Sequence, residues 1–304
     1  MDTKYLDVTI IGGGPAGLSA GLLLGRARKK VKIIDDSTPR NSVTREVHGY
    51  LTRNGISPTE FRRLARDELS EYPLVSFVDD TAKSITGEDG QFIVETMQGE
   101  TILSKKVIFA VGMKDEPLSI AGLDKVYGKS AFVCPYCDGW ELRDQPLVII
   151  NKGEELMHFA PIMSGWSKHL TVCTNGPDEL TDEQRDELRR NEVSLFESSI
   201  KQIDSHDGIV KQVVLEDGTA ISCRGIFFRP ELVIGSSLPQ AIGCEMTEWG
   251  GIEVDDFGKT SVPGIYSAGD GTTRRHQAIA AAAMGAFVAA MINNELNTDS
   301  WKRN

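Results

Sequence analysis

Residues 7–35 read DVTIIGGGPAGLSAGLLLGRARKKVKIID, and this stretch decides the fold. It opens with a short β-branched run, Asp7–Ile11, which predicts a strand. A glycine cluster follows, and then a stretch rich in alanine and leucine to about Arg28 predicts a helix. A second β-branched run, Val31–Ile34, predicts another strand that ends at Asp35. The segment is therefore a β-α-β unit of about thirty residues, the smallest unit of a dinucleotide-binding fold.

The glycine cluster has the spacing Gly12-x-Gly14-x-x-Gly17. Gly12 allows a tight turn, Gly14 lets the backbone approach a pyrophosphate, and Gly17 lets the helix pack closely on the strand. The N–H groups at the start of the helix, with the positive end of its dipole, would bind the phosphates. Asp35 ends the second strand, where a carboxylate accepts a hydrogen bond from a ribose hydroxyl. Because strand, turn, helix, strand and acid stand in register, the pattern favours a nucleotide site over a purely structural turn.

The rest of the chain predicts a second fold of the same kind. Leu147–Ile150 has the pattern of a strand, Asn151-Lys152-Gly153 that of a turn, and Leu170–Cys173 that of a further strand. Between the two units, residues 75–109 show short strands broken by glycines, which predicts a β-meander. A last strand, Gly264–Ala268, leads into an alanine-rich helix. We therefore expect an α/β protein with two dinucleotide-binding, Rossmann-like, three-layer domains, the second inserted into the first.

The composition limits the class of protein. The chain has 304 residues, with 33 lysines and arginines against 44 aspartates and glutamates, so its net charge is −11. A partner of nucleic acid or of an anionic membrane would show a basic face, so we expect neither. The apolar stretch Ala278–Ile292 is shorter than the ~20 residues that cross a bilayer and predicts a buried helix. An odd number of cysteines, five, argues against a secreted disulfide framework and favours the cytoplasm.

Cys134 and Cys137 stand apart as a C-x-x-C pair, followed by Asp138. Three interpretations are open: two of four zinc ligands, two inert thiols, or a redox pair that opens and closes a disulfide. The remaining cysteines are isolated from one another: Cys173, Cys223 and Cys244. Zinc would need two further ligands, so we favour the redox pair and expect no metal. Asp138 either exchanges the proton that a thiolate gains or loses, or caps a helix.

Three motifs together resemble one known family. They are G-G-G-P-A-G at residues 12–17, C-P-Y-C-D-G at residues 134–139 and T-S-V-P-G-I-Y-S-A-G-D at residues 260–270. In this order they resemble the low-molecular-weight thioredoxin reductases over nearly the whole chain. The resemblance implies a homodimer and an FAD-binding domain from residues 1–114 and 246–304. A pyridine-nucleotide and redox-disulfide domain, residues 115–245, would be inserted between them.

The same resemblance implies roles for individual residues. Cys137 would lie next to the flavin, Cys134 would exchange with the disulfide of a partner, and Asp138 would be the acid and base. Asp270 would contact the FAD linker, and Gln277-Ala278 would lie at the flavin ring. The full set expected to bind FAD is Gly12, Gly14, Pro15, Ala16, Gly17, Asp35, Arg40, Asn41, His48, Gly112, Gly269, Asp270, Gln277 and Ala278.

The inserted domain departs from the family pattern where its nucleotide turn belongs. Residues 150–156 read INKGEEL, so only Gly153 remains of a glycine-rich turn, and two adjacent glutamates would repel a pyrophosphate. Residues 173–178 read CTNGPD, with no cation where the family has arginines for the 2′-phosphate of NADPH. Each lost charge-assisted bond would cost about 1.5–3 kcal/mol. We therefore expect NADPH or NADH as the electron donor, with NADPH bound weakly.

Other details resemble a second branch of the superfamily, the dithiol oxidases of gliotoxin and holomycin type. These details are Pro39-Arg40-Asn41, His48-Gly49 and the run CDGWE at residues 137–141. His276 replaces an arginine that is common in the reductases, and it either tunes the flavin or packs.

These observations predict an FAD-dependent thiol–disulfide oxidoreductase. It would pass two electrons from a reduced nicotinamide through FAD and Cys134/Cys137 to thioredoxin, a similar protein or a small disulfide. One alternative is a dithiol oxidase that uses oxygen, or a reductase fed by another donor such as ferredoxin. A second alternative is a flavin-binding scaffold or redox sensor without activity, which the intact C-x-x-C pair disfavours.

Overall fold

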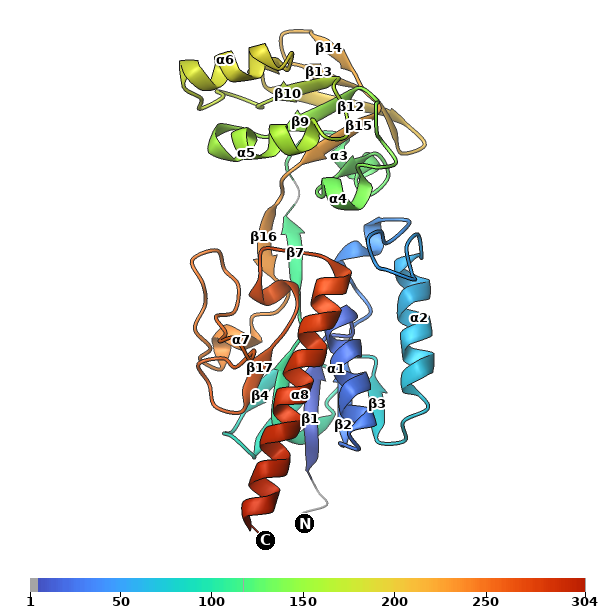
Figure 1. Ribbon diagram of the computed structural model, residues 1–304, viewed down its shortest axis with the longest axis vertical. Helices are drawn as coiled ribbons and strands as arrows, with labels where there is room; N and C mark the ends of the chain where they lie inside the picture. Colours follow the sequence, from blue (N-terminus) through green and yellow to red (C-terminus); the bar gives the residue numbers. More distant parts are fainter. Residues whose placement is uncertain (1–4, 117, 304) are drawn as a thin grey trace. The chain divides into compact units, whose positions relative to one another are not determined.

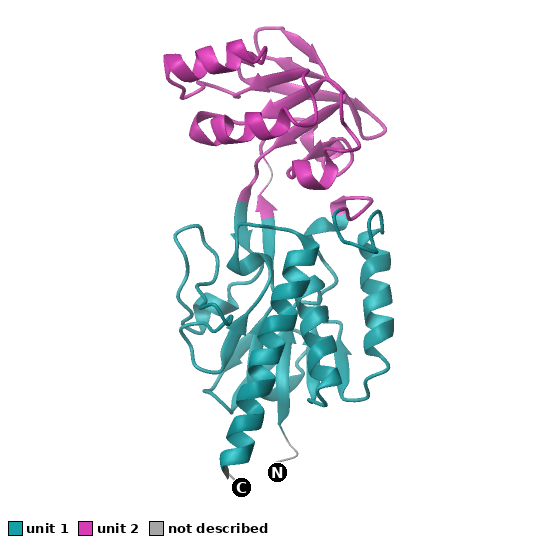
Figure 2. Cartoon of the chain, in the orientation of Figure 1, with its two compact units in different colours: residues 1–42, 49–114, 232–304 teal, residues 43–48, 115–231 magenta. Residues whose placement is uncertain are grey.

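The structure is a computed structural model that describes residues 5–116 and 118–303. These residues form two compact units (Figure 2). Unit 1 comprises residues 5–42, 49–114 and 232–303, and unit 2 comprises residues 43–48 and, Pro117 aside, 115–231. Unit 2 is therefore inserted into unit 1, and the predicted arrangement of two α/β folds is confirmed.

The end of the insertion differs from the expected one. The chain leaves unit 1 after Lys114 and returns at Leu232, whereas the sequence placed the return at residue 246. Leu238 and Cys244 are buried in a hydrophobic cluster of unit 1, so the segment between the two positions packs with unit 1. Such packing depends on contacts far apart in the chain, which a local pattern does not contain.

Unit 1 is built on a mostly parallel sheet (Figure 1). The strand order is β3-β2-β1-β6-β5-β4, and β17 pairs with β6; only β5 and β4 run antiparallel to their neighbours. The elements that lie wholly or partly in unit 1 are β1 (Leu6–Ile11), α1 (Pro15–Arg26), β2 (Val31–Ile34), η1 (Arg40–Val43), α2 (Pro58–Leu69), β3 (Val75–Val78), β4 (Ala82–Thr86), β5 (Phe92–Thr96), β6 (Thr101–Phe109), β7 (Met113–Glu116), β16 (Glu231–Ile234), α7 (Leu238–Ala241), β17 (Ile265–Ser267), η2 (Asp270–Thr272) and α8 (Ala278–Arg303). Of these, η1, β7 and β16 each cross a boundary with unit 2. The predicted β-α-β unit is thus β1-α1-β2.

The strands of unit 1 alternate their side chains between two cores. Val8 and Ile10 of β1 join a cluster with α1 and α8, while Ile11 joins a cluster with the antiparallel strands on the opposite face. Helices α1 and α8, from the two ends of the chain, lie side by side (Figure 1). A Cβ atom on Gly285 of α8 would lie 2.0 Å from the carbonyl oxygen of Ala16, so only glycine permits this approach.

The first strand of the region predicted as a meander, residues 75–109, belongs to the parallel part of the sheet. Residues 75–78 form β3, which pairs in parallel with β2 from Val31↔Val75 to Ile34↔Val78. The expected meander is therefore limited to β4, β5 and β6. The alternating pattern of a short strand indicates its type but not its partner, and this explains the error.

Unit 2 repeats the plan of a parallel sheet and a small antiparallel sheet. Its parallel sheet has the order β11-β10-β9-β15-β8, and β12-β13-β14 form the antiparallel sheet. The elements are α3 (Leu123–Val126), β8 (Ala131–Phe132), α4 (Pro135–Asp138), β9 (Leu147–Ile150), α5 (Gly153–Met163), β10 (Leu170–Cys173), α6 (Asp182–Arg190), β11 (Ser194–Phe196), β12 (Ile200–His206), β13 (Ile209–Leu215), β14 (Ala220–Ser222) and β15 (Gly225–Phe228). Val148 and Ile150 face the antiparallel sheet, and Leu147 and Ile149 face α5 and α6.

The predicted alanine-rich helix is α8, which continues to Arg303. By length and composition alone, Ala278–Lys302 could cross a membrane, a test that core helices of soluble proteins also meet. One face of α8 is buried against α1 through Ala281, Val288, Ala289 and Ile292. This packing is that of a core helix.

Candidate active site

The glycine turn after β1 has the geometry that each glycine was predicted to supply. Gly12 has a φ of +110°, and a Cβ atom there would lie 2.2 Å from the carbonyl oxygen of Ala110. A Cβ atom on Gly17 would lie 1.9 Å from the carbonyl oxygen of Gly12, which shows how closely α1 approaches the turn. Beside Gly14, by contrast, no atom lies within 4 Å of the Cβ position. The turn is therefore tight on the protein side and open where a ligand would approach.

The N-terminus of α1 suits an anion. Gly14 is its N-cap, with no side-chain cap, and Pro15 is its first residue, which donates no hydrogen bond. No acidic residue stands in the first turn, and the small Ala16 is 5% exposed. Backbone N–H groups and the helix dipole thus remain for a phosphate, so this donor set fits the pyrophosphate of FAD.

Asp35 stands at the end of β2 beside this turn and is 8% exposed. Its carboxylate accepts a hydrogen bond from the backbone N–H of Gly13 at 3.1 Å and also bonds to the guanidinium of Arg62. Arg62 lies in α2 and shares no motif with Asp35, so the sequence does not indicate this contact. The two contacts hold the carboxylate at the position that the fold uses to bind a ribose.

The segment after β17 reaches the same turn. Gly269 has a φ of +88°, and a Cβ atom there would lie 2.9 Å from the Cβ of Ala16. Asp270 follows as the first residue of η2. The carbonyl oxygen of Gln277 accepts a hydrogen bond from Ala281 at 2.9 Å, so Gln277 immediately precedes α8. Residues predicted from opposite ends of the chain are thereby brought together.

The remaining predicted cofactor residues divide between the two units. Arg40 and Asn41 begin η1, and a guanidinium nitrogen of Arg40 lies 3.8 Å from the carboxylate of Asp270. Gly112, with a φ of +61°, accepts a hydrogen bond from the backbone of the segment after β16 at 3.0 Å.

His48 lies in unit 2, where its Nε2 is 3.3 Å from Glu46 and 3.7 Å from Glu141. Two neighbouring carboxylates do not favour a phosphate. The expectation that His48 binds FAD therefore gains no support from these contacts.

The paired cysteines lie at the start of a short helix in unit 2. Cys134 is the N-cap of α4, Pro135 is its first residue, and Cys137 is in its only turn. The two sulfur atoms are 2.6 Å apart, and both residues are half-buried. The two sulfurs are therefore close enough to form a disulfide with each other.

Aromatic side chains surround α4. A Cβ atom on Gly139 would lie 3.0 Å from the ring of Trp166, so glycine lets this ring pack on the helix. The ring of Tyr136 meets Trp166 edge to face at 5.2 Å. Trp140 is 65% exposed, and the guanidinium of Arg143 lies 4.1 Å above its ring. Trp166 follows α5 and has no sequence signal that connects it with the cysteines.

The carboxyl group of Asp138, next to the cysteine pair, has a raised pKa. Burial raises the pKa of Asp138 to about 7, and the negative charge of Cys134 adds to the rise. His48 opposes this change in pKa, and Glu141 reinforces it. A carboxyl group with such a pKa can both give and take a proton near neutral pH.

The other three cysteines lie in the core. Burial raises the pKa of the Cys173 and Cys223 thiols to about 12, and it also raises the pKa of Cys244. Their thiolates are therefore scarce near neutral pH, so these thiols are inert. Among the described residues, no group of three or more histidine, cysteine or acidic side chains is arranged to hold a metal ion.

The second nucleotide turn differs from the first. Gly153 has a φ of +60° and begins α5, but the first turn of this helix carries Glu154 and Glu155. Glu155 lies 3.4 Å from Arg229, and Lys152 forms an ion pair with Glu179. Two carboxylates therefore stand where α1 offers only backbone N–H groups.

The polar side chains of the loop after β10 form hydrogen bonds and an ion pair within unit 2. The hydroxyl of Thr174 donates to the carbonyl of Gly176 at 2.5 Å, and the side chain of Asn175 accepts from the backbone of Ile200 at 2.7 Å. The buried Asp178 pairs with Arg185 of α6 at 2.7 Å, a cation that sequence analysis did not place here. The loop thus supplies no side-chain cation of its own to a 2′-phosphate.

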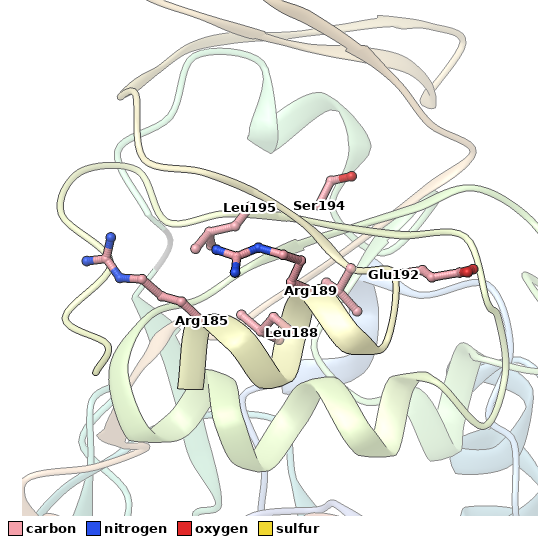
Figure 3. A pocket seen from close by; sticks show the side chains of 7 residues that line it. Arg185, Leu188, Arg189, Glu192, Ser194 and Leu195 are labelled. Atoms are coloured by element: carbon pink, nitrogen blue, oxygen red, sulfur yellow. The ribbon is translucent and has the colours of Figure 1, made fainter. Parts of the chain in front are cut away.

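A separate surface pocket of about 530 Å³ lies along α6 and the start of β11 (Figure 3). Its lining residues are Arg185, Leu188, Arg189, Glu192, Val193, Ser194 and Leu195. None of the predicted site residues lines it.

Comparisons with known proteins identify the family of the chain. The family model for pyridine nucleotide-disulphide oxidoreductases matches residues 6–285. Thioredoxin reductase sirT of Leptosphaeria maculans is 29% identical over 95% of this chain and 94% of its own. Thioredoxin reductase aclD of Aspergillus oryzae is 30% identical over 89% of this chain and 90% of its own.

Solved structures show the same likeness. The crystal structure of thioredoxin reductase TrxB from Bacillus anthracis is 39% identical, covers 97% of this chain and 100% of its own, and has a TM-score of 0.93. The crystal structure of HlmI is 30% identical, covers 100% of this chain and 96% of its own, and also has a TM-score of 0.93. With its open glycine turn and its adjacent cysteines, the chain belongs to the pyridine nucleotide-disulphide oxidoreductase family and is an FAD-dependent disulfide oxidoreductase.

Proposed function

We propose that this enzyme reduces the disulfide of a thioredoxin-like protein, using electrons from a reduced nicotinamide. The observation that carries the proposal is the Cys134–Cys137 pair, with sulfurs 2.6 Å apart beside a carboxyl group whose pKa is raised to about 7. A disulfide reductase needs such a pair and a nearby proton donor. The names of similar proteins, among them the thioredoxin reductases sirT and aclD, support the choice of partner.

Unit 1 would bind the FAD. The first N–H groups of α1 would bind the pyrophosphate, and Asp35 would accept a hydrogen bond from the ribose. Arg40, Asn41, Gly112, Asp270 and Gln277-Ala278 would complete the site by family resemblance. FAD, when bound, supplies a carrier for one electron pair between the nicotinamide and the cysteines.

The cysteines would carry out the exchange with the partner. The Cys134 thiolate attacks one sulfur of the partner disulfide, and a mixed disulfide forms as the partner's other sulfur leaves. Cys137 then attacks the Cys134 sulfur, which closes the enzyme disulfide and releases the second partner sulfur. The partner gains two electrons and two protons, and the enzyme dithiol loses the same number. Asp138 would deliver a proton to a departing sulfur.

The role of Asp138 predicts a change in the pH profile. In the wild-type enzyme, protonated Asp138 becomes scarcer as pH rises through about 7, so thiol–disulfide exchange that needs its proton should slow above that pH. Asp138→Asn should lower turnover by about 10² or more and remove this pH step. Steady-state rates between pH 5 and 9 measure both effects.

Asp144→Asn is the matched control, because Asp144 is exposed in the same unit and asparagine accepts its φ of +61°. It should keep the wild-type profile. A pH step that persisted in Asp138→Asn would contradict the assignment.

Rapid-mixing experiments on the flavin test the proposed function. The purified protein, without oxygen, is mixed separately with NADPH, NADH and a small dithiol while the flavin absorbance is followed. Bleaching by a nicotinamide and recovery on addition of oxidised thioredoxin would support the proposal. Bleaching by the dithiol alone, with recovery in air, would instead show a dithiol oxidase, and inertness toward all three would show another donor, such as ferredoxin.

One observation supports the oxidase or another donor as a second candidate. Glu154 and Glu155 occupy the first turn of α5, and the nearby Lys152 and Arg229 are engaged with Glu179 and Glu155. A nicotinamide dinucleotide bound at this helix would have to compete with these carboxylates. The identity of the nicotinamide, NADPH or NADH, is decided by the same mixing experiment.

We also propose a homodimer, formed through the outer face of α8. Ile279 is 40% exposed and Phe287, two helical turns later, is 73% exposed, with the exposed Ala283 between them. A second copy of the chain would cover this apolar stripe with the same stripe. We also propose a cytoplasmic location, because five cysteines, an odd number, argue against a secreted disulfide framework.

Phe287→Glu should dissociate this dimer. Two phenylalanines, one from each copy, would each lose a free energy of burial of about 1.5–3 kcal/mol. The dissociation constant of the dimer should therefore rise by a factor of at least about 100. Sedimentation across a range of concentrations measures the change. Phe257→Glu, at a residue 53% exposed in a loop, is the control and should remain dimeric. A monomeric wild-type protein would refute the dimer.

A further inference from the structure

Arg40 and His276 are 236 positions apart in the chain but meet within unit 1. A guanidinium nitrogen of Arg40, in η1, lies 2.9 Å from Nδ1 of His276, in the loop between η2 and α8. The other ring nitrogen of His276, Nε2, lies 2.8 Å from the carbonyl oxygen of Thr273. The carboxylate of Asp270 is 3.8 Å from the same guanidinium nitrogen.

These two contacts determine the state of the imidazole. A guanidinium can only donate hydrogen bonds, so Nδ1 must accept from Arg40. A carbonyl oxygen can only accept, so Nε2 must carry the proton that it donates to Thr273. His276 is therefore a neutral imidazole in the Nε2–H form, and a single side chain connects η1 with the loop that precedes α8.

Predicted cofactor residues flank the loop of residues 273–277 that contains His276. Asp270 lies on its N-terminal side, and Gln277 follows His276 directly and precedes the first turn of α8. Gly269 packs on Ala16 at the glycine turn, so the beginning of the segment is held as well. The Arg40–His276 contact thus links the loop that precedes α8 to η1.

We propose that His276 is a positioning residue, which in its neutral form holds the N-terminus of α8 against the flavin and releases it when protonated. The inference depends on the FAD-dependent function proposed above. Protonation converts Nδ1 from an acceptor into a donor, so the bond from Arg40 is lost and two cations face each other.

The charged groups around His276 determine how strongly the protonated imidazole is repelled. Arg40 of η1 faces the imidazole, and Asp270 of η2 offsets part of its charge from the far side. Arg274 and Arg275 precede His276 in its own loop and are exposed, and their charges add to the repulsion of an imidazolium. Arg40, Arg274 and Arg275 all oppose an added positive charge, so the contact is expected to open toward the acid end of the pH range in which histidines exchange a proton.

The flavin absorbance spectrum, measured on the oxidised holoenzyme between pH 5 and 8 in an Asp138→Asn background, tests the proposal, because that background removes the carboxyl group that titrates near pH 7. In this background the protein that keeps His276, called the wild type here, should show a one-proton transition. His276→Asn should keep the pH 8 spectrum at every pH, because an amide oxygen accepts from Arg40 and an amide N–H donates to Thr273 without titrating. His276→Ala should show the wild-type pH 5 spectrum at every pH. His206→Asn, at a residue 71% exposed in unit 2, should behave as the wild type.

The outcomes separate this inference from the proposed function. A transition that persists in His276→Asn, or a wild-type pH 8 spectrum in His276→Ala, would overturn the positioning role while FAD binding stands. Nitrogen NMR of the histidines gives a readout without flavin, since it distinguishes the Nε2–H form from the Nδ1–H form. An Nδ1–H form of His276 at pH 8 would also overturn the inference, whereas a protein that bound no FAD would refute the proposed function.

Discussion

Cys137→Ser is expected to give a protein that still binds FAD but no longer passes electrons between the flavin and a disulfide. Serine forms no disulfide with Cys134, so the enzyme loses the disulfide in which it would hold a second electron pair. Turnover with a protein disulfide should fall by about 10³ or more, which corresponds to about 4 kcal/mol of activation free energy. Anaerobic reductive titration should show two electron pairs per FAD in the wild type and one in the variant.

A matched control removes another cysteine. Cys244 is buried in unit 1, and its sulfur lies 3.6 Å from the hydroxyl of Thr260, which can bond to a serine in its place. Cys244→Ser should therefore keep two electron pairs and wild-type turnover. Unchanged turnover in Cys137→Ser would remove the redox-pair assignment.

Two alanine substitutions in the glycine turn should have different effects. In Gly17→Ala the new methyl group would lie 1.9 Å from the carbonyl oxygen of Gly12 and 3.2 Å from the side chain of Ile10. Helix α1 must then move away from β1, which should cost about 1–3 kcal/mol of unfolding free energy and disrupt the FAD site. Thermal unfolding of the FAD-free protein and titration with FAD measure the two losses separately.

Gly14→Ala is the informative counterpart. Gly14 has a φ of −80° and a ψ of −174°, which alanine adopts without strain, and no atom lies within 4 Å of the new methyl group. The FAD-free variant should be as stable as the wild type, whereas FAD should bind much more weakly because the methyl group occupies the place of the pyrophosphate. If Gly14→Ala bound FAD normally, or Gly17→Ala unfolded like the wild type, the assigned roles of these glycines would be wrong.

The parts of the molecule that could be predicted from the sequence are those specified locally. The turn from Gly12 to Gly17 is determined by neighbouring residues, and the positive φ of Gly12 and the close packing at Gly17 agree with the predicted geometry. The C-x-x-C spacing likewise places two sulfurs on one turn of helix. The pattern over residues 75–109 predicted short strands of a β-meander, but the pairing of β3 (Val75–Val78) with β2 depends on a tertiary contact that the local pattern does not encode.

The contacts that the sequence did not indicate join residues distant in the chain. Arg62 of α2 bonds to Asp35, which follows β2, and Arg40 bonds to His276, which lies 236 positions later in the chain. Neither pair has a characteristic spacing. The second nucleotide turn was predicted to be degenerate, and Glu154 and Glu155 indeed begin α5, but the internal bonds of Thr174 became visible only in three dimensions.

The discontinuity of unit 1 has a consequence for synthesis on the ribosome. Residues 115–231 of unit 2 are complete while β17 and α8 of unit 1 are still to be made. Domains fold as units during synthesis, so unit 2 can form its sheet first, around an unfinished partner. Until α8 emerges, α1 and the glycine turn lack the helix that packs on Ala16, and β6 lacks its neighbour β17. The newly made chain therefore acquires its redox cysteines in folded form before it can hold a flavin to reduce them.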